Sequence, residues 1–163
     1  MTDKPGLSRT AKIALGLVAL GAVCLPCIGA SALMGLPAYT RYILGAKAVE
    51  ARAHLALLQQ EVDALDRLPV SLPPTPDLAG LGPDPRPWPS DAAAEWSTLG
   101  FSPIDPVRYS YAVTSDPLLS TVRIEAFGDL NGNGVRSSYA RIGHYVPGAG
   151  ITWDELIVLD ELE

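Results

Sequence analysis

The feature that most constrains this chain is an N-terminal stretch without charge. No Asp, Glu, Lys or Arg stands between Lys12 and Arg41, and Leu, Ile, Val, Ala and Gly dominate the interval. About 20 such residues span the hydrocarbon core of a bilayer as a helix, and a helix satisfies its own backbone hydrogen bonds there even when prolines interrupt it. The sequence therefore predicts a transmembrane helix over residues 13–40, preceded by a short cytoplasmic segment, residues 1–12.

Basic residues before the stretch favour one orientation. Lys4, Arg9 and Lys12 precede it, and the positive-inside rule places such residues in the cytoplasm. We therefore expect a single-pass protein of a bacterial inner membrane, with its C-terminal domain on the extracytoplasmic, periplasmic side. A cleavable signal peptide ending near Ala30-Ser31-Ala32 is the alternative, but the apolar run is longer than the roughly 7–15 residues of a signal-peptide core.

Cysteine placement and charge exclude several functions. Both cysteines, Cys24 and Cys27, lie inside the apolar stretch, where we interpret them as small apolar residues rather than a redox pair. From Arg41 onward, nine Lys and Arg stand against seventeen Asp and Glu. Phosphate contacts need clustered positive charge, so this acidic part of the chain is not expected to bind nucleic acid.

A second helical pattern follows the apolar stretch. Residues 41–68 are rich in Ala, Leu, Glu, Gln and Arg, all strong helix formers. Five apolar residues recur there at helical spacing: Leu55, Leu58, Val62, Leu65 and Leu68. Such a stripe is typical of an amphipathic helix that covers a core. We predict that one helix continues out of the membrane and ends before Pro69.

Proline dominates the next segment. Ten of the fifteen prolines fall within residues 69–106, where each removes a backbone donor and fixes φ. We expect an irregular loop that lies over a sheet or serves as a linker. A proline-recognition ligand is the alternative.

From residue 107 the apolar period changes to two. Val and Tyr alternate with smaller or polar residues over 107–114, which is typical of a half-buried strand. We predict further strands over 120–128 and 135–143, and an edge strand over 156–159. Their short connections indicate an antiparallel meander.

A meander alone would leave one apolar face in water. The stripe on the preceding helix is the only large complementary surface in the sequence, so the helix should lie across the sheet. The predicted fold class is therefore α+β, with a long N-terminal helix packed on a small antiparallel β-meander in residues 107–163. The first half of that helix spans the membrane and the second half is amphipathic.

This order of elements resembles that of type IV pilins and pseudopilins. Leu36-Pro-Ala-Tyr-Thr-Arg-Tyr42, followed by the Lys, Glu, Ala and Leu-rich residues 46–55, resembles the turn and helix of that family. Residues 96–103, 107–111 and 126–134 resemble the sheet of short pilin-like proteins. The likeness covers roughly two thirds of the chain.

The resemblance implies a structural or assembly protein, part of a type IV pilus or a type II secretion-like system. Its helix would anchor it in the membrane and pack against other pilin-like subunits. One part of the family pattern is missing. Leu15 and Gly16 stand where the family has its Gly-Phe processing junction, and Leu20 stands where it has a glutamate.

Residues for catalysis are sparse. A nucleophilic triad or a metal centre needs clustered His, Cys, Asp or Glu, and the chain has only two histidines, His54 and His144. We interpret both as ordinary structural or exposed histidines and predict no enzyme and no catalytic residue. Four large aromatic residues are expected to pack in the core or anchor loops, with a binding surface as the alternative: Trp88, Trp96, Phe101 and Trp153.

One motif points to a cation. Asp129, Asn131 and Asn133 precede Gly134 at the spacing of the first half of an EF-hand loop. Ala140 stands where the bidentate Glu belongs, which leaves Ser137 as a weak oxygen donor. Since Asn-Gly is also the strongest hairpin signal, we favour a turn and keep a weak calcium site as the only cofactor candidate. The alternative function is thus a membrane-tethered extracytoplasmic module that binds calcium or another ligand.

Overall fold

The computed structural model describes residues 9–65 and 67–162, with side chains for Arg9 and from Pro37 onward. The chain consists of two compact units, Met1–Arg41 and Tyr42–Glu163. Helix α1, Arg9–Asp63, runs through both. Within the described residues, no helix has the length and apolar character needed to cross a membrane. The side chains of residues 10–36 lie outside that set, so the predictions about Cys24, Cys27 and the processing sites concern undescribed side chains.

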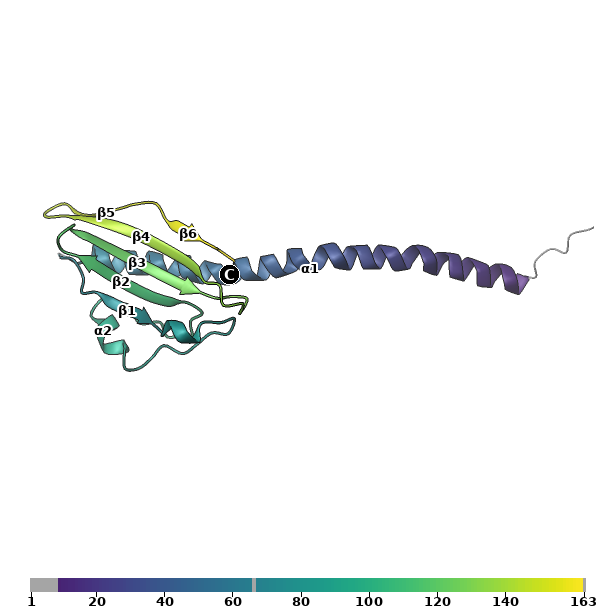
Figure 1. Cartoon of the computed structure of the whole chain (residues 1–163), viewed down its shortest axis with the longest axis horizontal. Helices are drawn as coiled ribbons and strands as arrows, with labels where there is room; N and C mark the ends of the chain where they lie inside the picture. Colours follow the sequence, from purple (N-terminus) through teal and green to yellow (C-terminus); the bar gives the residue numbers. More distant parts are fainter. Residues whose placement is uncertain (1–8, 66, 163) are drawn as a thin grey trace, which may run out of the picture. The chain divides into compact units, whose positions relative to one another are not determined.

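The second unit contains an antiparallel sheet. Its strands are β1 Leu72–Thr75, β2 Ser110–Asp116, β3 Thr121–Gly128, β4 Ser137–Val146, β5 Gly150–Trp153 and β6 Ile157–Leu159. They run in the order β1-β2-β3-β4-β5, and β6 pairs with β4 beside β5 (Figure 1). Each pair is antiparallel. The predicted α+β class and meander are confirmed.

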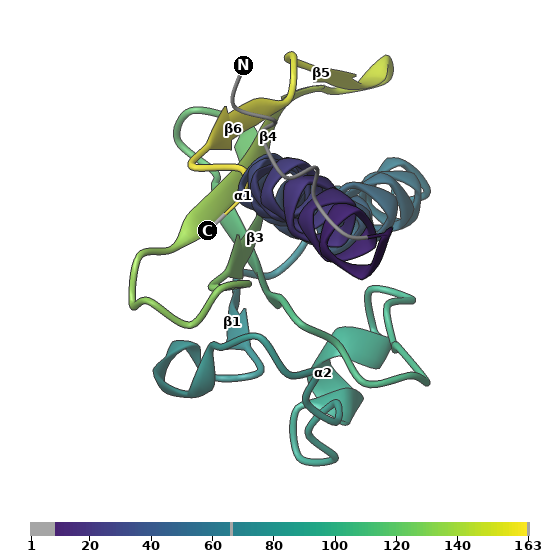
Figure 2. The ribbon, with the colours of Figure 1, turned by 90° about the vertical axis from the view of Figure 1, so that its right-hand side faces the viewer.

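The second half of α1 covers one face of this sheet. Figure 2 shows the strands on one side of it. Leu55, Leu58 and Val62 are at most 1 % exposed and belong to one core with strand residues such as Ile124 and Tyr139. Each such side chain contributes roughly 1.5–3 kcal/mol when fully buried. The predicted stripe therefore does pack on the sheet.

The helix ends earlier than predicted. It stops at Asp63 rather than at residue 68, and the amide of Leu65 bonds the carbonyl of Val62 at 3.1 Å, three residues back. Such a bond tightens the last turn and ends the helix. Leu65 and Leu68 remain partly buried against the core from outside the helix, so apolar spacing alone overestimated the helix length.

The proline-rich segment is more ordered than a plain loop. It contains strand β1, the 3₁₀ turn η1 Leu78–Gly80 and helix α2 Ala93–Ser97. Pro73 and Pro74 lie in β1, which is tolerated because β1 is an edge strand that pairs only with β2. Trp96 of α2 is fully buried in the core. The predicted irregular loop is wrong at these elements.

Strand limits also differ from the prediction. Val107 lies outside β2 and forms an isolated bridge with Arg86, while β4 starts at Ser137 and extends to Val146. Strand β5 was not predicted, whereas β6 confirms the predicted last strand. Ser110 is one of the polar residues that alternate with Val and Tyr in the predicted strand, yet it is buried, and its hydroxyl donates to the carbonyl of Pro76 in the proline-rich segment.

Candidate functional site

The predicted cation motif forms a closed turn after β3. Asp129 is buried, and its Oδ1 accepts hydrogen bonds from the amides of Gly132 at 2.8 Å and Asn133 at 3.1 Å. Its Oδ2 accepts the amide of Gly134 at 3.0 Å. Asn131 and Asn133 each accept an amide two residues ahead. The side chains thus complete a turn of their own backbone, the usual role of Asp and Asn in turns.

The fit of this motif to calcium is limited. Calcium takes 6–8 oxygen ligands, and the turn offers one carboxylate whose oxygens already accept three amides. Ser137 is buried, and its hydroxyl donates to the carbonyl of Gly128 at 3.2 Å, while Asn131 and Asn133 are exposed. In the described residues, no group of three His, Cys, Asp or Glu is placed to hold a metal ion. A calcium ion at Asp129 would need backbone carbonyls and waters.

A second polar cluster joins α1 to β2, and the sequence did not reveal it. The Nδ1 of His54 lies 2.8 Å from the hydroxyl of Tyr111. That hydroxyl also donates to Glu50 at 3.4 Å. Glu50 accepts the backbone amide of Arg108 at 2.7 Å and pairs with its guanidinium at 3.3 Å. Glu50 and His54 are four residues apart on one helix face, which is the signal that could have linked them.

Burial shifts the pKa values of His54 and Tyr111 in this cluster. Burial lowers the pKa of His54 below its ordinary 6.5, and the charge of Glu50 opposes this in part. Burial, reinforced by Glu50, raises the pKa of Tyr111 well above 10. At neutral pH the cluster therefore contains a neutral imidazole and a neutral phenol. It borders a surface hollow of about 300 Å³ beside Glu50, His54 and Arg108, but it contains no nucleophile activated by a base.

The aromatic residues named from the sequence mostly form one packed cluster. The ring of Trp88 lies 5.4 Å from that of Trp96 and 5.5 Å from that of Phe101, in edge-to-face geometry. Phe101 also contacts Tyr111 and His54. Trp153 lies elsewhere, on β5, and donates its indole hydrogen to Asp63 at the end of α1. Core packing and anchoring, the favoured interpretation, account for these contacts.

His144 sits apart from all of these. Its Nε2 lies 3.2 Å from a carboxylate oxygen of Asp154, and both side chains are 53 % exposed. Exposed pairs of this kind contribute little, about 0–1 kcal/mol. The structure therefore places the two histidines at separate positions, and of the two only His54 belongs to a partly buried network.

The outward face of α1 is the most unusual surface of the second unit. Between Tyr42 and Asp63, the exposed residues without charge are Tyr42, Ala46, Val49, Ala53, Ala56, Leu57 and Gln60. We call this set the outward helix face. Tyr42 is 72 % exposed, Val49 59 % and Leu57 47 %. A helix lying on a sheet normally has charged residues among its exposed ones; here the exposed charged residues, Arg52 and Asp63, contact Glu161 and Trp153 beside this set.

The charged side chains of this helical segment contact neighbouring parts of the domain on either side of the outward helix face. Glu50 pairs with Arg108, Arg52 with Glu161, and Asp63 accepts from Trp153. Lys47 bonds the carbonyl of Pro83, and the Glu61 carboxylate lies over Gly100. Each charged side chain between Tyr42 and Asp63 thus contacts another part of the domain. The outward helix face is left as an uncharged strip between two polar flanks.

Comparison with protein families, curated proteins and solved structures finds no significant match to this chain. The candidate sites are therefore judged on their geometry. The Asp129 turn satisfies itself, and the His54 cluster holds the helix on the sheet. The outward helix face is the candidate that its own domain does not explain.

Proposed function

We propose that this chain is a pilin-like or pseudopilin-like structural protein. In this proposal residues 13–40 anchor it in a bacterial inner membrane, and the sheet domain lies on the extracytoplasmic side. The outward helix face packs against helices of other pilin-like subunits, as in a type IV pilus or type II secretion-like assembly. No catalysis is required of it.

One observation carries the proposal, namely that the outward helix face is apolar, exposed and uncharged. Contiguous exposed apolar surface on a soluble domain marks an interaction site more often than chance. Its alanines, Ala46, Ala53 and Ala56, would let a second helix approach closely, and Tyr42, Val49 and Leu57 supply apolar area. The charged flanks contribute to the domain's own fold and so leave this strip open.

The assembly test introduces charge into the strip without disturbing the core. Val49→Glu and Ala53→Glu should abolish cross-links between chains from a photo-reactive residue at Leu57, measured with the full-length protein in membranes. Both positions are exposed, so the free energy of unfolding should change by less than about 0.5 kcal/mol. Ile104→Glu, at a loop residue that is 99 % exposed, is the matched control and should leave the cross-links intact. A wild-type chain without helix-to-helix cross-links would contradict the proposal.

The anchor and topology need a separate test. A reporter fused after Glu163 should be active only outside the cytoplasm, and carbonate washing should not release the chain from membranes. The N-terminal residue of the membrane-derived protein would show whether the chain is uncut, cut near Leu15 or cut after Ala32. Release by carbonate or a cytoplasmic reporter signal would contradict the membrane part of the proposal.

The alternative is a membrane-tethered module that binds calcium or another ligand at the Asp129 turn. One observation favours it: Oδ2 of Asp129 accepts a hydrogen bond from only one amide, that of Gly134, and has a further lone pair for a ligand. With one carboxylate, affinity should be no tighter than the roughly 10⁻⁴–10⁻³ M of extracellular modules. Calorimetric titration of wild type and Asp129→Ala tests this, and submicromolar binding that is lost in the variant would favour the module over the structural protein.

A further inference from the structure

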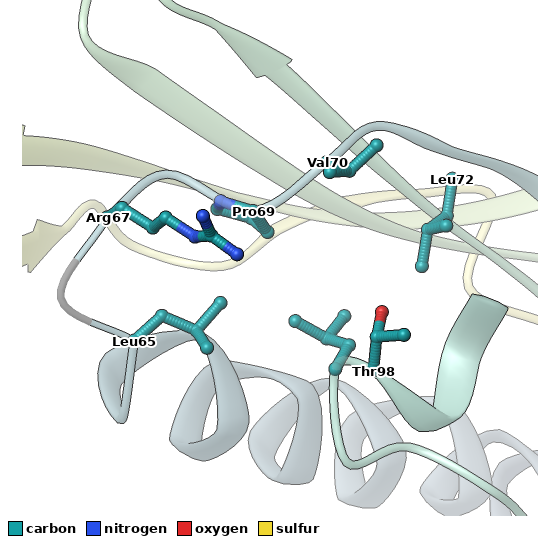
Figure 3. A pocket seen from close by; sticks show the side chains of 7 residues that line it. Leu65, Arg67, Pro69, Val70, Leu72 and Thr98 are labelled. Carbon is teal, nitrogen blue, oxygen red and sulfur yellow. The ribbon is translucent and has the colours of Figure 1, made fainter.

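Two parts of the second unit lie outside the outward helix face and the His54 cluster. One is an apolar groove of about 70 Å³ at the end of α1, lined by residues such as Leu65, Leu72 and Leu99 (Figure 3). The described residues that line it include no carboxylate, histidine or cysteine, so the groove brings no reactive groups together. The other is the turn after β3, where the buried carboxylate of Asp129 meets two Asn-Gly pairs. This turn contains groups that can react with one another.

An Asn-Gly pair can deamidate without an enzyme. The glycine backbone nitrogen loses its proton to hydroxide and attacks the side-chain carbonyl carbon of the asparagine. A carbon–nitrogen bond forms, the side-chain nitrogen takes a proton from water and leaves as ammonia, and a cyclic succinimide remains. A second water molecule then opens the ring to aspartate or isoaspartate. Glycine favours the attack because no side chain blocks its nitrogen. Asn131-Gly132 and Asn133-Gly134 both have this sequence, and all four residues are exposed.

Asp129 holds the attacking nitrogen of both pairs. Its Oδ1 accepts the amide of Gly132 at 2.8 Å, and its Oδ2 accepts the amide of Gly134 at 3.0 Å. A hydrogen bond to a carboxylate stabilises the protonated amide, and the adjacent negative charge opposes the formation of a nitrogen anion. The carboxylate therefore opposes the first step of the reaction at both pairs. Each glycine amide must leave Asp129 before its nitrogen can attack.

The two pairs differ in how readily they can leave. A methyl group on Gly132 would lie 3.2 Å from Cδ of Pro83, whereas on Gly134 it would have no neighbour within 4 Å among the described residues. Asn131 follows Leu130, which is 1 % exposed. Asn133 instead lies between two glycines, whose backbone rotates most freely. The pair Asn133-Gly134 is thus the less restrained of the two.

We propose that Asn133-Gly134 is the deamidation site of this domain and that the carboxylate of Asp129 sets the rate there by holding the amide of Gly134. The reaction changes the turn, because it adds a negative charge at position 133, four residues from Asp129. In the isoaspartate product the main chain runs through the former side chain of Asn133, whose Oδ1 now accepts the amide of Val135 at 2.6 Å. The inference does not rest on the proposed role of the outward helix face.

The test incubates the full-length protein in detergent at mildly alkaline pH and follows deamidation by mass spectrometry. Trypsin cleaves after Arg123 and Arg136, so residues 124–136 form one peptide that contains both pairs, and fragment ions locate the modified asparagine. A synthetic peptide of residues 127–137 has the same sequence without the fold and provides reference rates. Both pairs should react at least about tenfold more slowly in the folded protein than in the peptide, since a hydrogen bond to a charged group is worth roughly that factor. Asn133 should react faster than Asn131.

A variant that keeps the shape of the side chain isolates the carboxylate. Asp129→Asn retains an oxygen for the amides of Gly132 and Asn133 but presents an NH₂ group, which cannot accept, to the amide of Gly134. Deamidation of Asn133 should accelerate by about tenfold. Asp116→Asn is the matched control, because Asp116 also accepts two amides in a turn, those of Leu118 and Leu119. It creates no new reactive pair, since Pro117 has no amide hydrogen, and should leave the rates unchanged.

Three outcomes would overturn the proposal. One is a folded wild-type protein in which both pairs react as fast as in the peptide. Another is an unchanged rate at Asn133 in Asp129→Asn while tryptophan fluorescence shows the variant to be folded. A third is faster reaction of Asn131 than of Asn133 in the wild-type protein. The comparison of wild-type protein with peptide needs no variant, so it decides the matter even if Asp129→Asn does not fold.

Discussion

The two long faces of α1 between Tyr42 and Asp63 are alike in composition and opposite in environment. Toward the sheet, Leu55, Leu58 and Val62 are almost inaccessible to solvent. Away from it, Val49 and Leu57 are about half exposed. The domain explains the first face, because burying those side chains stabilises the fold. Nothing in the domain explains the second, because exposed apolar residues contribute little to folding.

The flanks sharpen this contrast. The helix does carry charge, but Glu50 on one side and Arg52 and Asp63 on the other contact the sheet and the C-terminal segment. The charged side chains of this helix thus lie between two uncharged sectors, the buried face and the outward helix face. The helix thus has two apolar sectors, one that is buried by the fold and one that is exposed and that we propose for contact with another molecule.

The largest expected effect compares adjacent leucines on the two faces. Leu58→Ala removes a fully buried side chain and should lower the free energy of unfolding by about 2–5 kcal/mol. Leu57→Ala, one residue away and 47 % exposed, should change it by less than about 0.5 kcal/mol. Denaturation of the full-length chain in detergent can be followed by tryptophan fluorescence, because Trp88, Trp96 and Trp153 all lie in the second unit.

Equal losses for the two variants would break the comparison. That result would mean that Leu57 is covered within the single chain. A small loss for Leu58→Ala would instead mean that α1 does not cover the sheet in solution. Either outcome removes the distinction between a folding face and a contact face.

A smaller effect separates the two flanks. Glu50→Ala leaves the partly buried backbone amide of Arg108 without its acceptor and should cost about 1–3 kcal/mol, since the donor loses its partner in the protein. Arg52→Ala removes an ion pair with Glu161 whose side chains are 50 % and 45 % exposed, and it should cost about 0–1 kcal/mol. The same denaturation experiment measures both. A larger loss for Arg52→Ala would show that the C-terminal flank, not Glu50, fixes the helix on the sheet.

Much of the fold could be predicted from periodicity. The spacing of Leu55, Leu58 and Val62 identified the buried helix face, and the alternation from residue 107 identified the antiparallel strands. These features are local, and each arises directly from backbone geometry. Strand β1 was missed because Pro73 and Pro74 argue against a strand unless its edge position is known.

The candidate sites were predicted less well. The Asp129 motif was recognised because its ligands are close in sequence, but the bonding of Ser137 to Gly128 depends on how β4 leaves the turn. The contact between His54 and Tyr111 joins residues 57 positions apart, and only the packing of helix on sheet brings them together. The outward helix face could have been found, since an uncharged helical spacing of Tyr42, Val49 and Leu57 is visible in the sequence.

The smallest expected effect is the dependence of stability on pH through His54, which lies at the edge between the two faces. Burial lowers the pKa of His54 below 6.5 in the folded state, whereas the unfolded chain has the ordinary value of about 6.5. As the pH falls below about 6.5, the unfolded chain therefore binds a proton that the folded chain resists. The free energy of unfolding should decrease as the pH is lowered from about 6.5 to the pKa of His54 in the folded state. Above neutral pH, His54 should not contribute to the dependence of stability on pH.

A matched pair of variants isolates this contribution. His54→Gln keeps a side-chain hydrogen-bonding group near Tyr111 but cannot titrate, so its stability should decrease less than that of wild type between pH 6.5 and 5. His144→Gln removes the exposed histidine that pairs with Asp154 and should leave the slope attributed to His54 unchanged. Carboxylates contribute mainly below this interval, since their ordinary pKa values are about 4. Parallel curves for wild type and His54→Gln would show that the imidazole is as accessible to protons in the folded chain as in the unfolded one, and that the flank beside Glu50 is open to water.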